Sequence, residues 1–209
     1  VWRFAMGKNM WKIRFRRGHF FQARDNYGKK YDEKWNRVNL GANIQQGNYL
    51  HRGEQGLFEG VGYRLFQLAG VEASDTHYVH FRIVDEEHEN GELNAAHPPL
   101  TSSGTQYDGD FWGLYEAHQQ VDGRFLDEHD LPEGNLYKME SWTGEIKNQY
   151  EYGATDKSDL NAFMNGYNQR PGEQWWRQNV HLERYYAYRT ILEAIHHYDN
   201  GAGKNYYYY

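Results

Sequence analysis

Alternation of apolar and polar side chains predicts most of the strands in this chain. Near the start, apolar and basic residues alternate in the order Trp11, Lys12, Ile13, Arg14, Phe15, Arg16. A period of two residues is typical of a strand with one buried face. The same pattern predicts strands over Trp35 to Leu40 and within Val71 to Asp85. A further strand over Phe111 to His118 is expected to pair with the preceding one as a hairpin, and another starts in Gly134 to Lys138.

Apolar residues spaced by three and four positions predict the helices. The first covers Gly53 to Ala69, and Gly70 fits the residue that ends it. Its apolar stripe, which we expect to be core, comprises Leu57, Phe58, Val61, Leu65, Phe66 and Leu68. A short helix is expected over Val121 to His129, and Ser158 is the expected N-cap of a helix that reaches Asn165. A long helix is expected over His181 to Tyr198, with a buried stripe of Leu182, Tyr185, Tyr186, Ile191, Leu192 and Ile195.

The order of these elements, strands with one helix first and then mostly helices, predicts an α+β fold with two lobes. The expected lobes are strand-rich up to about residue 140 and helical from about 141 to 209. A length of 209 residues fits a single domain. The acidic stretch from Glu86 to Asp108 lacks any hydrophobic period and is expected to be a surface insertion.

Composition excludes several classes of function. A net charge of −6 argues against a nucleic-acid binder, which needs a basic face. No apolar run is long enough to span a membrane, and the absence of cysteine excludes disulfides and thiolate metal sites. The eleven histidines form no H-x-x-x-H or H-E-x-x-H motif, which disfavours a structural zinc site. The chain opens and closes within strand-like sequence, so we expect an internal piece of a longer protein.

The closing residues combine the chemistry that phosphoryl transfer requires. A helical stretch is followed by Asp199, a glycine-rich turn, Asn205 and four tyrosines that favour a strand. An aspartate can accept the proton of an attacking hydroxyl, and an asparagine can hold a metal that bridges phosphates. Five residues separate the two, one more than in the protein-kinase loop. The alternative is that Asp199 and Asn200 merely end a helix that Gly201 caps.

Several collinear stretches resemble the CotH family, the spore coat protein H-like atypical protein kinases. "FWGLYEAHQQVDGRFL" at 111–126 resembles the family's G-x-Y…E-Q-V-D-x-x-F-L signature, and "GNLYK" at 134–138 its next motif. "LFQLAGV" at 65–71 resembles a helix end of the family, and "WRFAMGKNMWKIRF" at 2–15 its W-R-x-P-K-K-S-Y-R-I-K-F strand. "YDNGAGKNYYYY" at 198–209 resembles the segment that carries its catalytic Asp and its Asn-Y-Y-L-Y run.

The resemblance implies a kinase-like fold and transfer of the γ-phosphoryl group of ATP to Ser or Thr hydroxyls of a protein substrate, with Mg²⁺ or Mn²⁺. It implies that Asp199 is the catalytic residue and that Asn205 is a metal ligand. Cofactor binding would involve Lys8 or Lys12, with Glu59 orienting the lysine, and Gln119 in place of the family's Glu. The resemblance further implies a bacterial protein that is secreted or lies at the cell or spore surface.

Two parts of the family pattern would lie outside the chain. An R-G-N-S turn would precede Val1, and a second metal-binding Asp would follow Tyr209, so we expect residues 1–209 alone to lack transfer activity. The alternatives are an inactive pseudokinase and a carbohydrate- or surface-binding module. For the second, Trp175 and Trp176 are the candidate exposed pair, since exposed aromatic rings stack on sugars. A glycosidase is less favoured, because no spacing singles out a pair of carboxylates.

Overall fold

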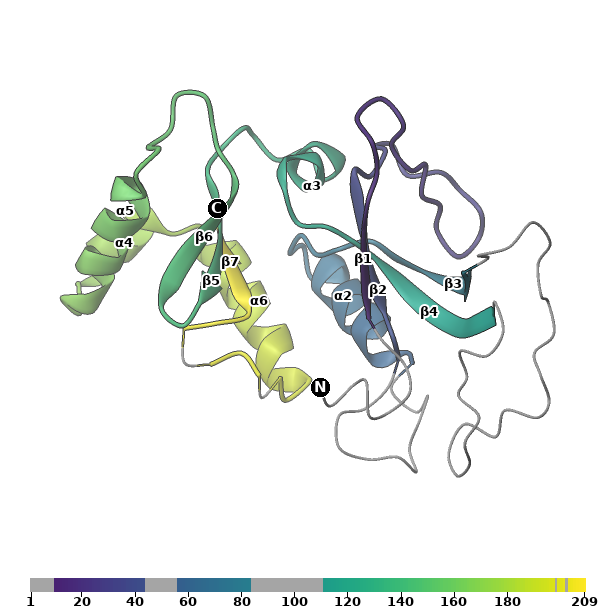
Figure 1. Ribbon diagram of the computed structural model, residues 1–209. Coiled ribbons are helices and arrows are strands. Elements are labelled where there is room, and N and C mark those ends of the chain that lie inside the picture. The colour runs from purple at the N-terminus through teal and green to yellow at the C-terminus, as the bar shows by residue number, and fades with distance from the viewer. Residues whose placement is uncertain (1–9, 44–55, 84–110, 198, 202) are drawn as a thin grey trace. The chain divides into compact units, whose positions relative to one another are not determined.

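The computed structural model describes residues 10–43, 56–83, 111–197, 199–201 and 203–209. Both helices and antiparallel sheets are present, so the predicted α+β class is confirmed. The chain divides into two compact units (Figure 1). Unit 1 contains Val1–Tyr63 and Ser74–Gln120, and unit 2 contains Arg64–Ala73 and Val121–Tyr209. The division falls after Gln120, and the strand Leu136–Glu140 that follows it pairs with Tyr206–Tyr208 at the other end of unit 2.

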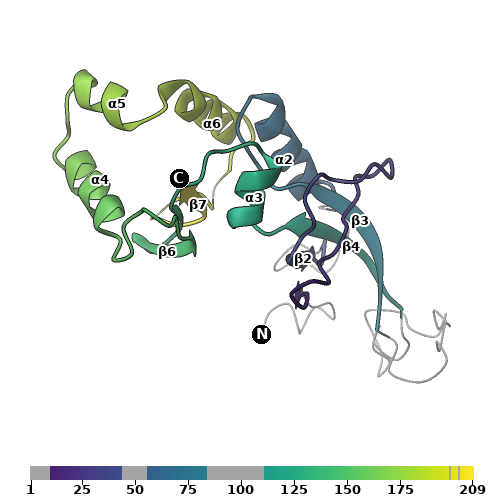
Figure 2. The same ribbon diagram turned by 90° about the horizontal axis from the view of Figure 1, so that it is seen from above.

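Unit 1 is built on an antiparallel sheet with the order β1-β2-β4-β3, of which Figure 2 labels β2, β3 and β4. Its strands are β1 (Trp11–Arg14), β2 (Arg37–Gly41), β3 (Thr76–Arg82) and β4 (Phe111–Gln119). Each corresponds to a strand predicted from alternation, and the expected hairpin partners β3 and β4 are paired. The predicted acidic insertion between these two strands lies outside the described residues, as does the start of the chain up to Asn9.

One face of this sheet carries the core of unit 1. Tyr115 and Ala117 of β4 are buried there with Val38 and Leu40 of β2. The loop between β1 and β2 folds back over this face through Trp35, which is stacked on Tyr31 at 5.6 Å between ring centroids. Because strand side chains alternate, the residues between Tyr115 and Ala117, and after Ala117, face the opposite side of the sheet. They are polar: Glu116 and His118.

Helix α2 (Phe58–Leu68) ends two residues before Gly70, the residue predicted to stop it, which has a left-handed φ of 78°. The prediction that its apolar stripe forms core is wrong. None of its residues is buried, and Leu57 just before it is 61% exposed. The helix instead places Gly60 next to the side chain of Glu116, and the ring of Tyr63 lies 5.6 Å from the ring of His118. The missing side chain at Gly60 allows this approach, so the glycine side of α2 meets the sheet.

Unit 2 contains a second antiparallel sheet with the order β6-β5-β7. Its strands are β5 (Leu136–Glu140), β6 (Thr143–Asn148) and β7 (Tyr206–Tyr208), and its helices are α3 (Gly123–Glu128), α4 (Ser158–Asn168), α5 (Glu173–Asn179) and α6 (Leu182–Ala194). The sequence patterns predicted all of these except β6 and α5. The final strand, β7, pairs with β5, which joins the end of the chain to the centre of the sheet.

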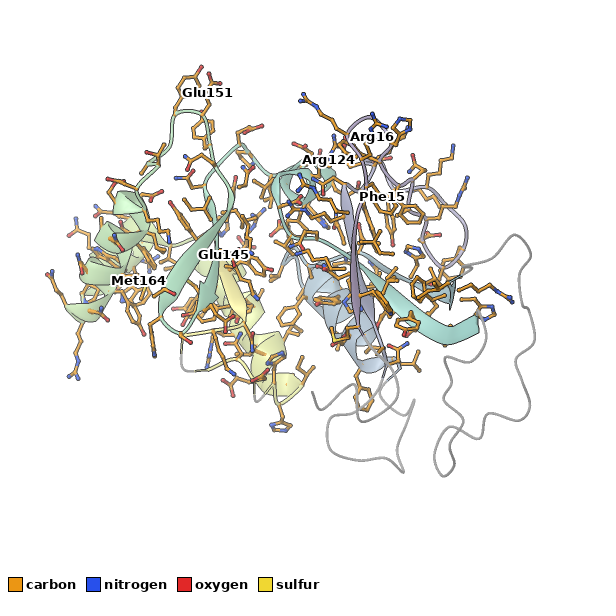
Figure 3. The ribbon with its side chains drawn as sticks, viewed as in Figure 1. Phe15, Arg16, Arg124, Glu145, Glu151 and Met164 are labelled. Atoms are coloured by element: carbon orange, nitrogen blue, oxygen red, sulfur yellow. The ribbon has the colours of Figure 1, made fainter. Side chains whose placement is uncertain are left out.

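One of the two apolar clusters of unit 2 lies between this sheet and α4. Tyr137 and Met139 of β5 are buried with Leu160 of α4, and Met164 of the same helix packs against them (Figure 3). Gly144 of β6 makes the approach possible, because a Cβ there would lie 2.2 Å from Leu160 Cδ2. The cap of α4 differs from the prediction: Ser158 is its first residue, and Asp156 accepts the backbone N–H of Ser158.

The last helix, α6, is shorter than expected and less buried. His181 is its N-cap and accepts the N–H of Arg184 through Nδ1. Of the predicted stripe only Leu192 is buried, whereas Tyr185 and Tyr186 are exposed. Their rings pack along the surface instead, with Tyr185 stacked on Trp176 of α5. Within the described part of the chain, no helix has the length and apolar character that crossing a membrane requires.

Candidate functional site

The end of unit 2 has the order of elements that the sequence predicted for a phosphoryl-transfer loop. Helix α6 is followed by a turn that contains Asp199 and Asn205, and β7 begins at the next residue, Tyr206. We call residues 199–205 the Asp199 turn. The structure describes residues 199–201 and 203–205 of this turn.

The carboxylate of Asp199 is held by two side chains from its own turn. Asn205 Nδ2 donates to Asp199 Oδ2 at 2.9 Å and to the backbone oxygen of Asp199 at 2.8 Å. Lys204 Nζ lies 3.1 Å from Asp199 Oδ1. The side chain of Asp199 is nevertheless 54% exposed. The turn therefore presents an oriented acid to solvent, with a cation beside it.

Backbone hydrogen bonds connect the turn to the neighbouring sheet. Asn205 N–H donates to Met139 O at 3.1 Å, and Trp142 N–H donates to Gly203 O at 2.9 Å. Asn200 Nδ2 donates to the hydroxyl of Tyr188 on α6. Asn205 itself has a φ of 63°, a left-handed conformation that asparagine tolerates better than most residues. These contacts fix the side chain of Asn205 at the end of the turn.

The oxygen atoms of the turn suit a hard divalent cation. The amide nitrogen of Asn205 is engaged by Asp199, which leaves its Oδ1 without a donor among the described residues. Amide and carboxylate oxygens are the protein ligands that Mg²⁺ takes, usually in small number and together with phosphate oxygens and water. Oδ1 of Asn205 therefore fits as a ligand of a Mg²⁺ ion that also contacts phosphate and water. Lys204 was missed in the sequence, where only the Asp-to-Asn spacing was considered.

The predicted cofactor-binding residues belong to unit 1. Those that the structure describes lie on two different faces of its sheet. Lys8 lies outside the described residues. Lys12 pairs with Asn39, and Asn39 pairs with His118, so these three share one face of the sheet. Glu59 reaches that same face from α2, where it contacts His118 Nε2 at 3.3 Å.

Gln119 falls on the other face of the same sheet. It follows His118 in β4, is 3% exposed, and its Oε1 accepts the backbone N–H of Asp75 at 3.4 Å. Its own N–H donates to Asp75 O at 2.9 Å. The side chain thus ties β4 to the residue before β3, and the structure does not bring it together with Lys12 and Glu59.

A cluster that the sequence did not reveal lies between α2 and β4. We call Glu59, Glu116 and His118 the carboxylate–histidine cluster; their ligand atoms all lie within 4.8 Å of one another. Glu116 Oε2 is 3.4 Å from His118 Nε2, and its side chain is 0% exposed. Burial and the negative charge of Glu116 together raise the pKa of Tyr78 on the adjacent strand. Sequence spacing could not show this cluster, because Glu59 is far from β4 along the chain.

The tryptophan pair considered as a sugar platform is half-buried. Trp175 packs against Phe163 of α4 with ring centroids 5.4 Å apart, and Trp176 packs against Tyr167 at 5.8 Å. Both rings therefore serve the contact between α4 and α5. Close approach there depends on Gly166, where a Cβ would lie 2.8 Å from the Trp175 ring.

Comparison with known proteins yields no matching family model, no matching curated protein and no matching solved structure. The geometry of each unit is thus what bears on function.

Proposed function

We propose that the chain belongs to an ATP-dependent protein kinase that transfers the γ-phosphoryl group to Ser or Thr hydroxyls. The observation that carries this proposal is the Asp199 turn, in which Asn205 and Lys204 orient a half-exposed carboxylate between α6 and β7. An acid, an amide that could hold a metal and a cation lie in one turn, and these are the groups that this reaction needs. A helix cap alone would not require the two side-chain contacts to the same carboxylate.

Each polar group of the turn has a role in the proposed reaction. Asp199 would accept a hydrogen bond from the acceptor hydroxyl and take its proton as the hydroxyl oxygen bonds to phosphorus. Asn205 would offer Oδ1 to the divalent cation while its Nδ2 holds Asp199 in place. Lys204 would place its positive charge near the oxygens of the transferred group. Bound Mg·ATP would supply the phosphoryl group and leave as Mg·ADP.

Unit 1 would contribute to nucleotide binding through its polar sheet face in a kinase-like two-lobed arrangement. Lys12 and Glu59 both belong to that face, which is compatible with a lysine that binds phosphate and an acid that orients it. Either Lys8 or Lys12 could be that lysine. Gln119 is the least supported of the cofactor-binding residues, because its side chain is engaged on the other face. The proposed kinase would be a bacterial protein that is secreted or lies at the cell or spore surface.

The proposal is tested by following phosphate transfer from γ-labelled ATP by the protein that contains this chain. Replacing a general base typically costs about 10²–10⁴-fold in rate, so Asp199→Asn should reduce transfer by that amount. Binding of Mg·ATP should persist, because Asn205 and Lys204 are retained.

Asp130→Asn is the matched control, since Asp130 is an exposed acid in another turn of unit 2. It should leave transfer unchanged. Wild-type transfer by a folded Asp199→Asn variant would exclude Asp199 as the base. Metal-dependent nucleotide binding without any transfer, by wild type and variant alike, would identify an inactive pseudokinase instead.

A further inference from the structure

We propose that Glu59, Glu116 and His118 form a binding site for one Zn²⁺ ion within unit 1. The site is separate from the Asp199 turn and does not depend on kinase activity; with Zn²⁺ bound, Glu59 would be a metal ligand instead of the acid that orients a lysine. One ligand comes from α2 and two come from alternate positions of β4, which place their side chains on the same face of the sheet. The ion would thereby join the helix to the sheet.

The environment of Glu116 is the main indication that a metal ion binds here. Its side chain is fully buried, and neither of its carboxylate oxygens accepts a hydrogen bond from a described residue. Nε2 of the nearly buried His118 also lacks a hydrogen bond of normal geometry. Burying an ionised carboxylate without partners is strongly unfavourable, and coordination to a metal is one of the ways in which proteins offset it. Among the described residues, no Lys or Arg forms an ion pair with Glu116, whose neighbour in the cluster is the imidazole of His118.

The distances within the cluster fit coordination better than ion pairing. His118 Nε2 is 3.3 Å from Glu59 Oε2 and 3.4 Å from Glu116 Oε2. Charge-assisted N–H···O bonds are shorter, about 2.7–2.9 Å. In a tetrahedral Zn²⁺ site with bonds of about 2.0–2.2 Å, neighbouring ligand atoms are roughly 3.3–3.6 Å apart. The two contacts of His118 therefore have the spacing of tetrahedral edges.

Two glycines leave space around these atoms. A Cβ at Gly60 of α2 would lie 2.2 Å from Glu116 Oε1. A Cβ at Gly41 of β2 would lie 3.0 Å from His118 Nε2 and 3.2 Å from Glu59 Oε2. The residue opposite Glu116 in the sheet is Gly41 itself. The space around the cluster therefore depends on glycine at positions 41 and 60, because a side chain at either position would contact the ligand atoms.

The choice of Zn²⁺ follows from the ligand types. Zn²⁺ binds both imidazole nitrogen and carboxylate oxygen, and catalytic zinc sites hold the ion with three protein ligands and keep the fourth position open. Mg²⁺ and Ca²⁺ prefer all-oxygen coordination, so the histidine disfavours them. Glu59, whose side chain is 59% exposed, gives the fourth position a route to solvent.

The site is tested on the full protein after chelation, by titrating Zn²⁺ against a chromophoric chelator. Wild type should take up one equivalent that Mg²⁺ does not displace. Loss of a group that merely orients a ligand costs about 10–100-fold in affinity, so removing a ligand should cost at least about 100-fold. Glu59→Gln, Glu116→Gln and His118→Gln should each show that loss. Gly41→Ala should weaken binding as well, because its methyl group enters the space around the cluster without removing a ligand.

Glu151→Gln and His80→Gln are the matched controls, since both residues are exposed and lie outside the cluster (Glu151 is labelled in Figure 3). They should bind Zn²⁺ like wild type. Because Glu59 and Gly41 can be changed without removing a buried charge, those two variants decide the question if the other two fail to fold. Substituted Co²⁺ should give the visible absorption of a tetrahedral site in wild type and lose it in Glu59→Gln. Absence of Zn²⁺ uptake by wild type, equal uptake by the Glu59→Gln and Gly41→Ala variants, or displacement by Mg²⁺ would overturn the proposal.

Discussion

Asp199 shows how a single side chain can be both exposed and fixed. Its carboxylate contacts Asn205 Nδ2 and Lys204 Nζ, so its orientation does not depend on burial. Asn205 makes this contact from a left-handed backbone conformation, with a φ of 63° at the end of the turn. Such conformations cost energy and persist where the surroundings fix them. The hydrogen bond from Asn205 N–H to Met139 O supplies part of that restraint.

Gly203 lies at a point of the turn that has no room for a side chain. Its φ is 68°, and a Cβ would lie 2.4 Å from the Trp142 side chain and 2.7 Å from the Trp142 backbone nitrogen. Backbone cannot move aside as a flexible side chain can. We expect Gly203→Ala to lower the free energy of unfolding by about 1–3 kcal/mol, measured by urea denaturation.

Gly201→Ala is the control for that substitution, because Gly201 lies in the same turn and a Cβ there meets nothing within 4 Å. Its effect should stay within about 0.5 kcal/mol, as for most surface substitutions. Equal effects of the two substitutions would show that packing against Trp142 does not constrain the turn.

The roles of individual residues could be predicted from the sequence only where the interacting residues are close together along the chain. Asp199 and Asn205 are close along the chain, so their juxtaposition was foreseeable. Glu116 and His118 are also close in sequence and share a strand face, yet their significance depends on Glu59, which a different element supplies. Lys204 was overlooked because its contact to Asp199 depends on how the turn closes.

At the scale of elements, alternation was the most dependable signal. Val79 and Phe81, alternate residues of β3, both pack on the core. Side chains alternate between the two faces of a strand, so the buried face of a half-buried strand can be read from the sequence. The face of α2 was predicted wrongly, because Gly60 and Tyr63 decide which side meets the sheet. Apolar periodicity shows which face of a helix could be buried. Which face of α2 actually packs on the sheet depends also on the side chains that the sheet presents to it.

Strand β5 and helix α4 are joined by a hydrogen bond that should make stability depend on pH. Tyr137 is 3% exposed, and its hydroxyl lies 2.6 Å from Asp159 Oδ1. Burial and the bond to Asp159 raise the pKa of Tyr137 to about 12. The folded value therefore exceeds the unfolded value of about 10. The resulting stabilisation is complete below pH about 10 and is lost as the pH rises toward 12.

We expect the free energy of unfolding of wild type to fall between pH 10 and 12 more than that of Tyr137→Phe, by on the order of 2 kcal/mol. Denaturation series at several alkaline pH values measure this difference. Tyr152→Phe, at a tyrosine that is 79% exposed, is the control and should follow wild type. Parallel curves for wild type and Tyr137→Phe would contradict the role assigned to the Tyr137–Asp159 bond.

At the scale of the whole molecule, each unit has its own sheet and its own apolar clusters. Unit 1 buries Trp35, Tyr115 and their neighbours, and unit 2 buries Tyr137, Met139 and Leu160. Each also carries one polar constellation, the carboxylate–histidine cluster in unit 1 and the Asp199 turn in unit 2. The proposed functions of the two constellations call for different metals, since the first includes a nitrogen ligand and the second offers oxygen alone.

Nucleotide binding is the most direct test of the proposed function, because it needs no knowledge of the protein substrate. The measurement is the free energy of unfolding of the protein that contains this chain, with ATP at about a hundred times its dissociation constant. A ligand at that concentration stabilises the folded state by roughly 2–3 kcal/mol. We predict this gain with Mg²⁺ present and much less after chelation. Asn205→Gly, which keeps the left-handed backbone accessible but removes the amide, should lose most of it.

Stabilisation of wild type by ATP that is equal with and without Mg²⁺ would contradict the account. So would an undiminished gain in Asn205→Gly, or no stabilisation by ATP under any condition.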